Sequence, residues 1–552
     1  MNRRDLIKAA AATGILSQIA WAQQGPPDIL FISVDDLNDW VNPFDAPKPV
    51  SEAITPFIQS LAQSSTVFQR AYAPSIICGA SRSAVLSGMA PHVTGVLNNE
   101  NLFEPRVLPG AQGFEGPLLQ NHQGSIAKWL KIAGYRTALC GKVYHGAGYN
   151  DLAWATPGMR ETGVWDAYRN VDNDELFLSG KACPTSQSSA DISQWAQAYC
   201  GDPDHLPDVK VKNWAVQQLA CSVPTQPLFL ALGLFKPHTR WQVPLAHLNA
   251  FNLNNIEVPN RVTELDKAAG DPAISCLGLN RSGDEPNSGD WEGSLKIATQ
   301  AYLGCIRFVD AMIGEILVAA KARRDATSRR QIIVLWSDHG YFLGTRQGFH
   351  KTKFFERAAR VPLLIFDSGR NLTAPQTVMT PVSTQDLFPT LLELGQVGNG
   401  NNQLNPLLVD GQSLVPYING GSAPEQDVLS SFNFRQLWGA GLAAGAVACS
   451  AERALATTSV VHPSRAIGAS YSLRWRDQAN GAIWRYTWYY QAGLFTRLSG
   501  QAPIPNEELT QVNPSTLDDG ANLLAGSNAA SFEPVRVFLK ARLETRIGRA
   551  LA

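Results

Sequence analysis

The chain has few of the features that mark several common protein classes. Its 552 residues contain only eight scattered cysteines, too few for a disulfide scaffold, and they lack the paired spacing that holds a zinc finger. It carries no surplus charge, with 46 Lys and Arg against 47 Asp and Glu, so no global field attracts nucleic acid or an anionic membrane. After the N-terminus no apolar run approaches about 18 residues, so we expect no membrane span.

The N-terminal residues resemble an export signal. Arg3, Arg4 and Lys8 supply positive charge, a modestly apolar stretch follows, and Ala20-Trp21-Ala22 offers small residues for cleavage. The paired arginines followed by Leu-Ile-Lys resemble a twin-arginine signal, with an ordinary secretory signal as the alternative. We therefore predict a signal at residues 1–22 and a periplasmic or secreted mature protein.

A protein exported from the cytoplasm can form disulfide bonds between its cysteines. Cys183 and Cys200 lie in a polar stretch and are candidates for a loop-closing disulfide, a pairing that the sequence leaves open. Cys140 lies in an apolar run and is expected to be a core residue.

Short apolar runs alternate with amphipathic stretches, the pattern of a mainly parallel sheet flanked by helices. The pattern predicts an α/β fold class. Buried strands are expected at residues 28–34, 135–140, 227–235, 331–336 and 361–366. Helices with apolar residues three and four positions apart are expected at residues 55–65, 124–133 and 301–320.

The composition shifts to Gly, Asn, Gln and Pro around residues 395–425, where we place a domain boundary. The predicted catalytic domain spans residues 26–400 and a smaller C-terminal α+β subdomain spans residues 425–552. Within the subdomain, residues 470–476 and 482–490 predict a hairpin, and residues 532–551 predict a closing amphipathic helix.

Polar side chains follow four of the predicted strands, where ligands of open α/β sheets bind. They are Asp35 and Asp36, Asp338 and His339, Lys142 and His145, and the run Lys236-Pro237-His238. Adjacent carboxylates need a counter-charge, and this mixed donor set suits Ca²⁺, Mg²⁺ or Mn²⁺ better than tetrahedral zinc. The alternative, in which each Asp pair only caps a helix, is favoured for one pair alone but weakened by the coincidence of all four motifs.

Cys78 precedes a predicted helix at residues 81–89. A helix start favours an anionic nucleophile, a thiolate or a bound sulfate or phosphate group. The alternative is a small buried residue of no chemical role.

These residues carry a family resemblance. Cys78-x-Ala80-Ser81-Arg82, followed by residues 83–88, resembles the formylglycine signature of type I sulfatases, in which a formylglycine-generating enzyme oxidises the cysteine to an aldehyde. Gly141-Lys142-Val143-Tyr144-His145 resembles the second signature of that family. Ala80 departs from the usual proline, and cysteine-type members tolerate alanine there.

Within the family, Asp338-His339, Lys236-Pro237-His238 and residues 337–362 resemble the iduronate-2-sulfatase branch. The resemblance covers about residues 26–400 and implies an alkaline-phosphatase-like sandwich. Residues 343–348 replace the acidic and histidine-bearing loop common at this point, so the resemblance alone does not imply uronate specificity.

The resemblance implies hydrolysis of sulfate monoesters, with a sulfated saccharide or small molecule as substrate. The implied metal ligands are Asp35, Asp36, Asp338, His339 and the modified Cys78, with Ca²⁺ as the family expectation. The implied catalytic residues are Arg82 and Lys142, which orient the aldehyde hydrate, Lys351 and His238, which bind sulfate and protonate the leaving oxygen, and His145, which deprotonates the hydrate.

Several alternatives stay open on the sequence alone. Lys142 and Lys351 could instead be solvated surface lysines with no functional role. His350 and Lys353 are close to Lys351 in the sequence, and either could take the role assigned to it. Lys236 is equally a sulfate ligand or a salt-bridge partner. Other functions that fit are phosphonate monoester or phosphodiester hydrolysis in the same superfamily, and carbohydrate binding without catalysis.

Overall fold

The structure is a computed structural model. It describes residues 25–52, 54–97, 99, 124–145, 164–169, 171, 196–221, 225–260, 291–345, 349–397, 409–423, 427–432, 469–489, 507–513, 519–524, 527–548 and 551. The predicted export signal and Cys183 lie outside the described residues. Cys200 is disulfide-bonded, but the structure does not test its pairing with Cys183.

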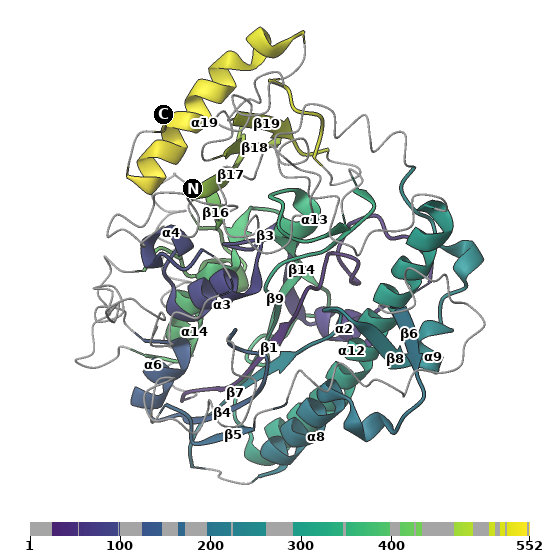
Figure 1. The fold of residues 1–552 in the computed structure, drawn as a ribbon. Helices are drawn as coiled ribbons and strands as arrows, with labels where there is room; N and C mark the ends of the chain where they lie inside the picture. The colour runs from purple at the N-terminus through teal and green to yellow at the C-terminus, as the bar shows by residue number, and fades with distance from the viewer. Residues whose placement is uncertain are drawn as a thin grey trace, which may run out of the picture.

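An eight-stranded sheet forms the centre of the molecule (Figure 1). Its order is β14 (Gln376–Val378), β2 (Ser65–Phe68), β13 (Leu363–Asp367), β9 (Gln331–Ser337), β1 (Asp28–Val34), β7 (Leu228–Leu234), β4 (Arg136–Gly141) and β5 (Ala167–Arg169). All five predicted strands are therefore confirmed, with ends shifted by two residues or fewer. Only β13 runs antiparallel to its neighbours, so the sheet is mixed but mainly parallel.

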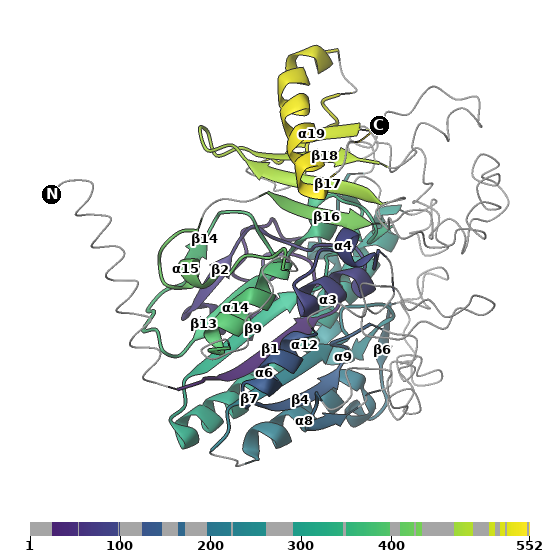
Figure 2. The same cartoon turned by 90° about the vertical axis from the view of Figure 1, so that its left-hand side faces the viewer.

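Helices cover both faces of this sheet (Figure 2). One face packs against α3 (Cys78–Ser87), α6 (Ile126–Ile132) and α14 (Leu387–Leu394), and the other against α2 (Pro56–Ala62), α8 (Pro207–Ala220) and α12 (Trp291–Thr327). Along β1, Ile29 and Phe31 join the first core while Leu30 and Ile32 join the second. Alternate side chains of a strand point to opposite faces, so a continuous apolar run is required here.

Two helices begin at least three residues before their predicted starts. Helix α3 begins at Cys78 rather than Ser81, because the chain is still extended at Ile77 and turns helical directly after it. Gly79 and Ser81 are weak helix formers, so helix propensity does not indicate a helix start as early as Cys78. Helix α12 spans 37 residues and extends the predicted segment in both directions.

The C-terminal part forms its own four-stranded antiparallel sheet. Its strands are β16 (Val428–Phe432), β17 (Ser470–Arg476), β18 (Ile483–Trp488) and β19 (Glu507–Gln511), and α19 (Glu533–Ile547) packs on it through Leu539 and Leu543. The predicted hairpin and closing helix are confirmed. The predicted boundary at residues 395–425 stays a prediction.

Short elements complete the described fold. They are β3 (Ala71–Tyr72), β12 (Arg360–Val361) and β15 (Val382–Ser383) in one small sheet, the pairs β6 (Ala196–Tyr199) with β8 (Trp241–Pro244) and β10 (Phe342–Leu343) with β11 (Phe349–His350), and helices α4 (Pro91–Thr94), α9 (Leu245–Leu248), α13 (Glu356–Ala359) and α15 (Val415–Ile418). Among the described residues, none of the helices has the length and apolarity needed to span a bilayer.

Candidate functional site

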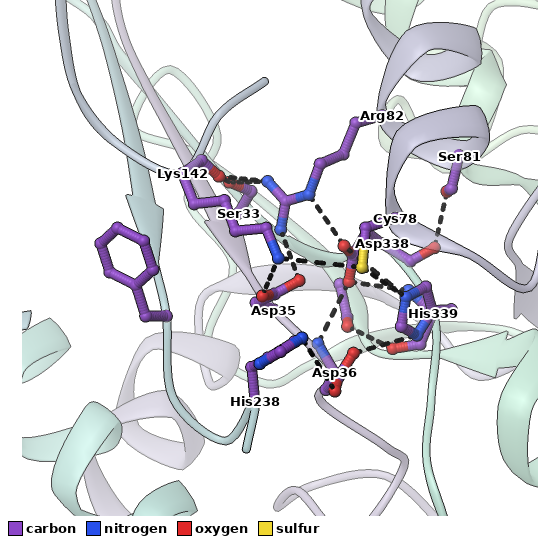
Figure 3. Close-up of polar contacts among 12 residues, drawn as sticks. Ser33, Asp35, Asp36, Cys78, Ser81, Arg82, Lys142, His238, Asp338 and His339 are labelled. Atoms are coloured by element: carbon purple, nitrogen blue, oxygen red, sulfur yellow. Dashed lines mark hydrogen bonds and ion pairs between the residues drawn. The ribbon is translucent and has the colours of Figure 1, made fainter. Parts of the chain in front are cut away.

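The two acidic motifs meet at one edge of the sheet. Strands β1 and β9 are parallel neighbours and Val34 pairs with Ser337, so the residues that follow each strand emerge side by side. The backbone N–H of Asp36 donates to Asp338 Oδ1 at 3.2 Å. Figure 3 shows Asp35, Asp36, Asp338 and His339 converging on one small volume, and all four are buried.

Asp36 has a backbone conformation that most residues avoid. Its φ of 62° lies in the left-handed region, which Asp tolerates better than most side chains. The hydroxyl of Tyr302, on α12, donates to the carbonyl oxygen of Asp36 at 2.6 Å and accepts the N–H of Asn38 at 2.9 Å. Sequence analysis missed Tyr302, because nothing in an amphipathic helix indicates contact with a residue 266 positions away.

Cys78 lies at the centre of the site (Figure 3). As the first residue of α3, it lies at the positive end of a ten-residue helix. Its Sγ is 3.1 Å from His339 Nε2, 3.2 Å from Lys351 Nζ and 3.8 Å from Lys142 Nζ. The side chain is 1% exposed. Lys142, Lys351 and His339 surround Cys78, and the positive end of α3 begins at it. This position therefore favours a negative charge.

Arg82 lies one turn further along α3 and contacts the acidic groups. Its Nε donates to Asp338 Oδ2 at 2.8 Å, its Nη2 to Asp35 Oδ1 at 3.2 Å, and its Nη1 to the Ser33 hydroxyl at 3.2 Å. Lys142 also contacts Asp35 and, through its carbonyl oxygen, accepts from Arg82. Arg82 and Lys142 therefore compensate the carboxylates, and of the two Lys142 also approaches Cys78.

Lys351 and His238 lie on the side of the site nearest the surface. Lys351 Nζ is 2.7 Å from Asp36 Oδ1, and its side chain is 12% exposed. Both residues that flank it, His350 and Thr352, have positive φ values of 79° and 74°. Strained non-glycine backbone of this kind often occurs at functional sites. The structure thus brings Lys351, rather than Lys353, to the site.

His238 completes that side. Its Nδ1 is 2.7 Å from the carbonyl oxygen of Thr239, which orients Nε2 toward Asp36 Oδ2 at 3.9 Å. Burial lowers the pKa of His238 to about 4, although the Asp36 charge opposes this. The side chain remains 25% exposed. His238 is therefore a group in the site that an incoming ligand can reach.

His145 follows Lys142 on the same loop. Burial, with the charge of Lys142 as the next cause, lowers the pKa of His145 well below its usual value. Its Nδ1 is buried and has no hydrogen-bond partner among the described residues. The imidazole is therefore neutral, with one nitrogen available to a ligand or a proton.

Lys236 does not enter the site. It is 2% exposed, and its Nζ donates to the carbonyl oxygen of Arg240, while its backbone N–H is 3.2 Å from Asp208 Oδ2. Both contacts brace the loop that carries His238. Trp241, which follows this loop, is fully buried and packs edge-on against Tyr302, so it is a core residue.

Opposing effects set the charge of the carboxylates. Burial by itself raises the pKa of Asp35 and Asp36, but the positive groups around each carboxylate, with Lys142 first at Asp35 and Lys351 first at Asp36, together outweigh it, so both pKa values lie below their usual range. The site therefore holds ionised carboxylates at neutral pH.

The donor set fits a divalent cation. Three overlapping groups, each with ligand atoms within 4.8 Å of one another, are Asp35, Asp36 and Asp338; Asp36, Cys78 and His339; and Asp35, Cys78 and His238. Asp36 Oδ2 is buried and accepts no hydrogen bond from any described residue. Burial by itself lowers the pKa of His339, but the Asp338 charge and the charges of neighbouring groups together outweigh it and raise the pKa to about 9. A ligated imidazole must be neutral, so metal binding here releases a proton.

Comparisons with known proteins agree with this geometry. A family model described as Sulfatase matches residues 27–397. A sulfatase of Formosa agariphila is 30% identical over 400 residues, covering 67% of this chain and 69% of that protein. The iduronate 2-sulfatase of Mus musculus is 28% identical, covering 66% of this chain and 62% of that protein. The fold matches the phosphonate monoester hydrolase of Agrobacterium radiobacter with a TM-score of 0.67 and 21% identity, covering 94% of this chain and 95% of that one.

Proposed function

The chain belongs to the sulfatase family and is a sulfuric ester hydrolase, and from that premise we propose that its nucleophile is formylglycine made from Cys78. One observation carries the proposal. Cys78 lies at the start of α3, and its Sγ is within 3.8 Å of Lys142, Lys351 and His339, three groups that come from different segments of the chain. A formylglycine-generating enzyme would supply the oxidant for this conversion during maturation.

We propose that Asp35, Asp36, Asp338, His339 and the modified residue 78 hold one divalent cation, with Ca²⁺ as the first choice. The carboxylate-rich donor set favours a hard cation. When bound, the cation supplies charge neutralisation and lowers the pKa of the attacking hydroxyl.

The reaction then follows from the positions of the side chains. One hydroxyl of the hydrated aldehyde at position 78 attacks sulfur, and the bond between sulfur and the alcohol oxygen breaks. Lys351 and His238, on the open side, bind the sulfate group. Lys351 is protonated and can give a proton to the departing alcohol directly, whereas His238, with a pKa of about 4, does so only after it takes up a proton as the anionic substrate binds. The result is a sulfate ester on residue 78 and a free alcohol.

Sulfate leaves in a second step that a serine or cysteine could not perform. His145, neutral and with a free Nδ1 among the described residues, takes the proton of the second hydroxyl. The carbon–oxygen bond to sulfate breaks, the aldehyde is restored, and water hydrates it again. Lys142 and Arg82 keep Asp35 and Asp338 in place throughout.

Turnover by the purified protein tests this function. We expect kcat/KM for an aryl sulfate to exceed that for an aryl phosphonate monoester, which the fold match keeps as the alternative. Lys351→Ala should lower sulfate turnover by about 10²- to 10³-fold, the usual cost of losing one group that stabilises developing charge. Lys128→Ala, which removes an exposed lysine of α6, is the matched control. A preference for the phosphonate would replace the proposed function with the alternative.

The substrate is proposed to be a sulfated carbohydrate. Support comes from the iduronate 2-sulfatase relative, whose name specifies a sulfated sugar. Sulfate release from sulfated disaccharides and from small alkyl sulfates, measured by ion chromatography, distinguishes the two classes. Faster release from the alkyl sulfates would contradict the carbohydrate assignment.

We also propose that the protein is exported to the periplasm or beyond. The support is the sequence of residues 1–22 alone. Replacing Arg3 and Arg4 by lysine should block export through the twin-arginine route, leaving the protein in the cytoplasmic fraction. Unchanged export of that variant would favour the ordinary secretory signal.

A further inference from the structure

A basic pocket lies at the opposite end of the sheet from Cys78. It is lined by the end of α12, the residues before β9, the end of β13, the turn after β13, and Ser64 just before β2. The charged residues among them are Arg324, Arg329, Arg330 and Arg370. Strand β9 begins at Gln331 beside this pocket and ends at Ser337 beside the acidic site. Seven residues of strand separate the two by about 23 Å.

Four of the lining residues are arginines, and none of the lining residues that the structure describes is a carboxylate. Three nearby carboxylates neutralise part of this charge: Asp367 accepts from Arg330 at 2.9 and 2.6 Å, Asp28, which also pairs with Arg323, lies 3.5 Å from Arg329, and Asp325 lies 3.7 Å from Arg324. The C-terminal end of α12 adds about half a negative charge. These effects together are smaller than the four positive charges, so the pocket keeps a positive surplus.

Arg324 and Arg370 use few of their N–H donors in the contacts that the structure describes. Arg370 donates to Gln376 Oε1 at 2.6 Å and forms no ion pair with any described residue, while burial lowers its pKa. Arg324 Nε is 3.7 Å from Asp325, which is already paired with Lys321 at 2.5 Å. A guanidinium has five N–H donors in a planar fork that matches the oxygens of sulfate and phosphate. Arg324 and Arg370 can therefore donate hydrogen bonds to the oxygens of a bound sulfate or phosphate group.

We propose that this pocket is a second binding site, for the sulfate or phosphate group of a small molecule. The cavity volume of about 710 Å³ lies within the range of small-molecule sites, and it leaves room for more than the oxyanion itself. Ser64, Ser328 and Ser368 add hydroxyl groups to the same wall. The site is separate from Cys78, and it does not depend on the proposed catalytic mechanism.

Equilibrium dialysis with radiolabelled sulfate and with radiolabelled phosphate tests the proposal, because it counts bound anions per chain. The variant that carries Arg324→Gln and Arg370→Gln should bind one anion fewer than the wild-type protein, with unchanged kcat/KM. Arg542→Gln removes one positive charge from the surface of α19, away from the pocket, where its side chain is 38% exposed, and should bind like the wild type. Competition by a sugar sulfate and a sugar phosphate then identifies which molecule carries the group.

A second variant guards against misfolding of the first. Ser64→Glu keeps all four arginines but places a negative charge in the pocket wall, and should weaken binding at this site at least tenfold. Equal anion counts in the wild type and the double variant would overturn the proposal, as would equal losses in Arg542→Gln.

Discussion

Gly233 of β7 and Gly141 of β4 pair directly across the sheet, next to the site. A Cβ at position 233 would lie 2.0 Å from the carbonyl carbon of Lys142, 2.1 Å from its oxygen and 2.5 Å from its nitrogen. Ordinary contact begins at 3.4 Å, so Gly233→Ala must displace the Lys142 backbone by roughly 1.4 Å. These contacts are backbone atoms, which cannot rotate away as a side chain would.

A shift of this size should affect both stability and activity. Overpacking costs about 1–3 kcal/mol of unfolding free energy, and a misplacement of about 1 Å in a catalytic group costs about 10²-fold in rate. We therefore expect Gly233→Ala to fold, with kcat/KM for an aryl sulfate lowered about 100-fold. The measurements are steady-state kinetics and urea denaturation.

Gly134→Ala is the control for replacing a glycine. Its Cβ would meet nothing within 4 Å, although its φ of 90° adds strain of about 1–3 kcal/mol to a non-glycine residue. It should lose stability but keep kcat/KM. If Gly233→Ala kept wild-type kcat/KM, Lys142 would not depend on the close approach of β4 and β7, and the geometric reasoning would be refuted.

Three further predictions concern other residues. Arg82→Ala should lower the unfolding free energy by about 3–5 kcal/mol in urea denaturation, since Asp338 loses its guanidinium partner and Asp35 loses one of its two buried cations, Lys142 being the other, and Arg82→Lys should restore only part of it. Tyr302→Phe should weaken Ca²⁺ affinity about tenfold in calorimetry, because Asp36 loses the hydrogen bond that holds its backbone. Burial raises the pKa of Asp310 to about 6, above the unfolded value of about 3.9, so its contribution favours the native state below about pH 4 and is lost as pH rises through about 6. Asp310→Asn removes this dependence, and its unfolding free energy should fall less than that of the wild type between pH 4 and 6, by up to about 3 kcal/mol.

Much of the fold was predictable because it depends on local pattern. The strand runs are short, apolar and bounded by polar residues, and the chemistry follows them directly at Asp35, Lys142, His238 and Asp338. Parallel strands place such residues at one edge, so their convergence could be expected without coordinates.

The rest depends on contacts between distant segments. Lys351 and Lys353 look alike in sequence, and only the turn with positive φ on both sides of Lys351 directs it to Cys78. The sequence does not decide whether Lys236 is a sulfate ligand or a salt-bridge partner. In the structure Lys236 is buried and donates to the carbonyl oxygen of Arg240, so it supports the loop that carries His238. The contact between Tyr302 and Asp36 could not be predicted from the sequence, because Tyr302 lies on the apolar face of a helix and nothing in that pattern indicates that its hydroxyl reaches Asp36.

Mass spectrometry of the tryptic peptide Ala71–Arg82 from active protein tests the central claim most directly. We predict that residue 78 is an aldehyde, detected as the loss of the thiol and by trapping with a hydrazine. An intact Cys78 thiol in protein that hydrolyses sulfate esters at full rate would contradict the account.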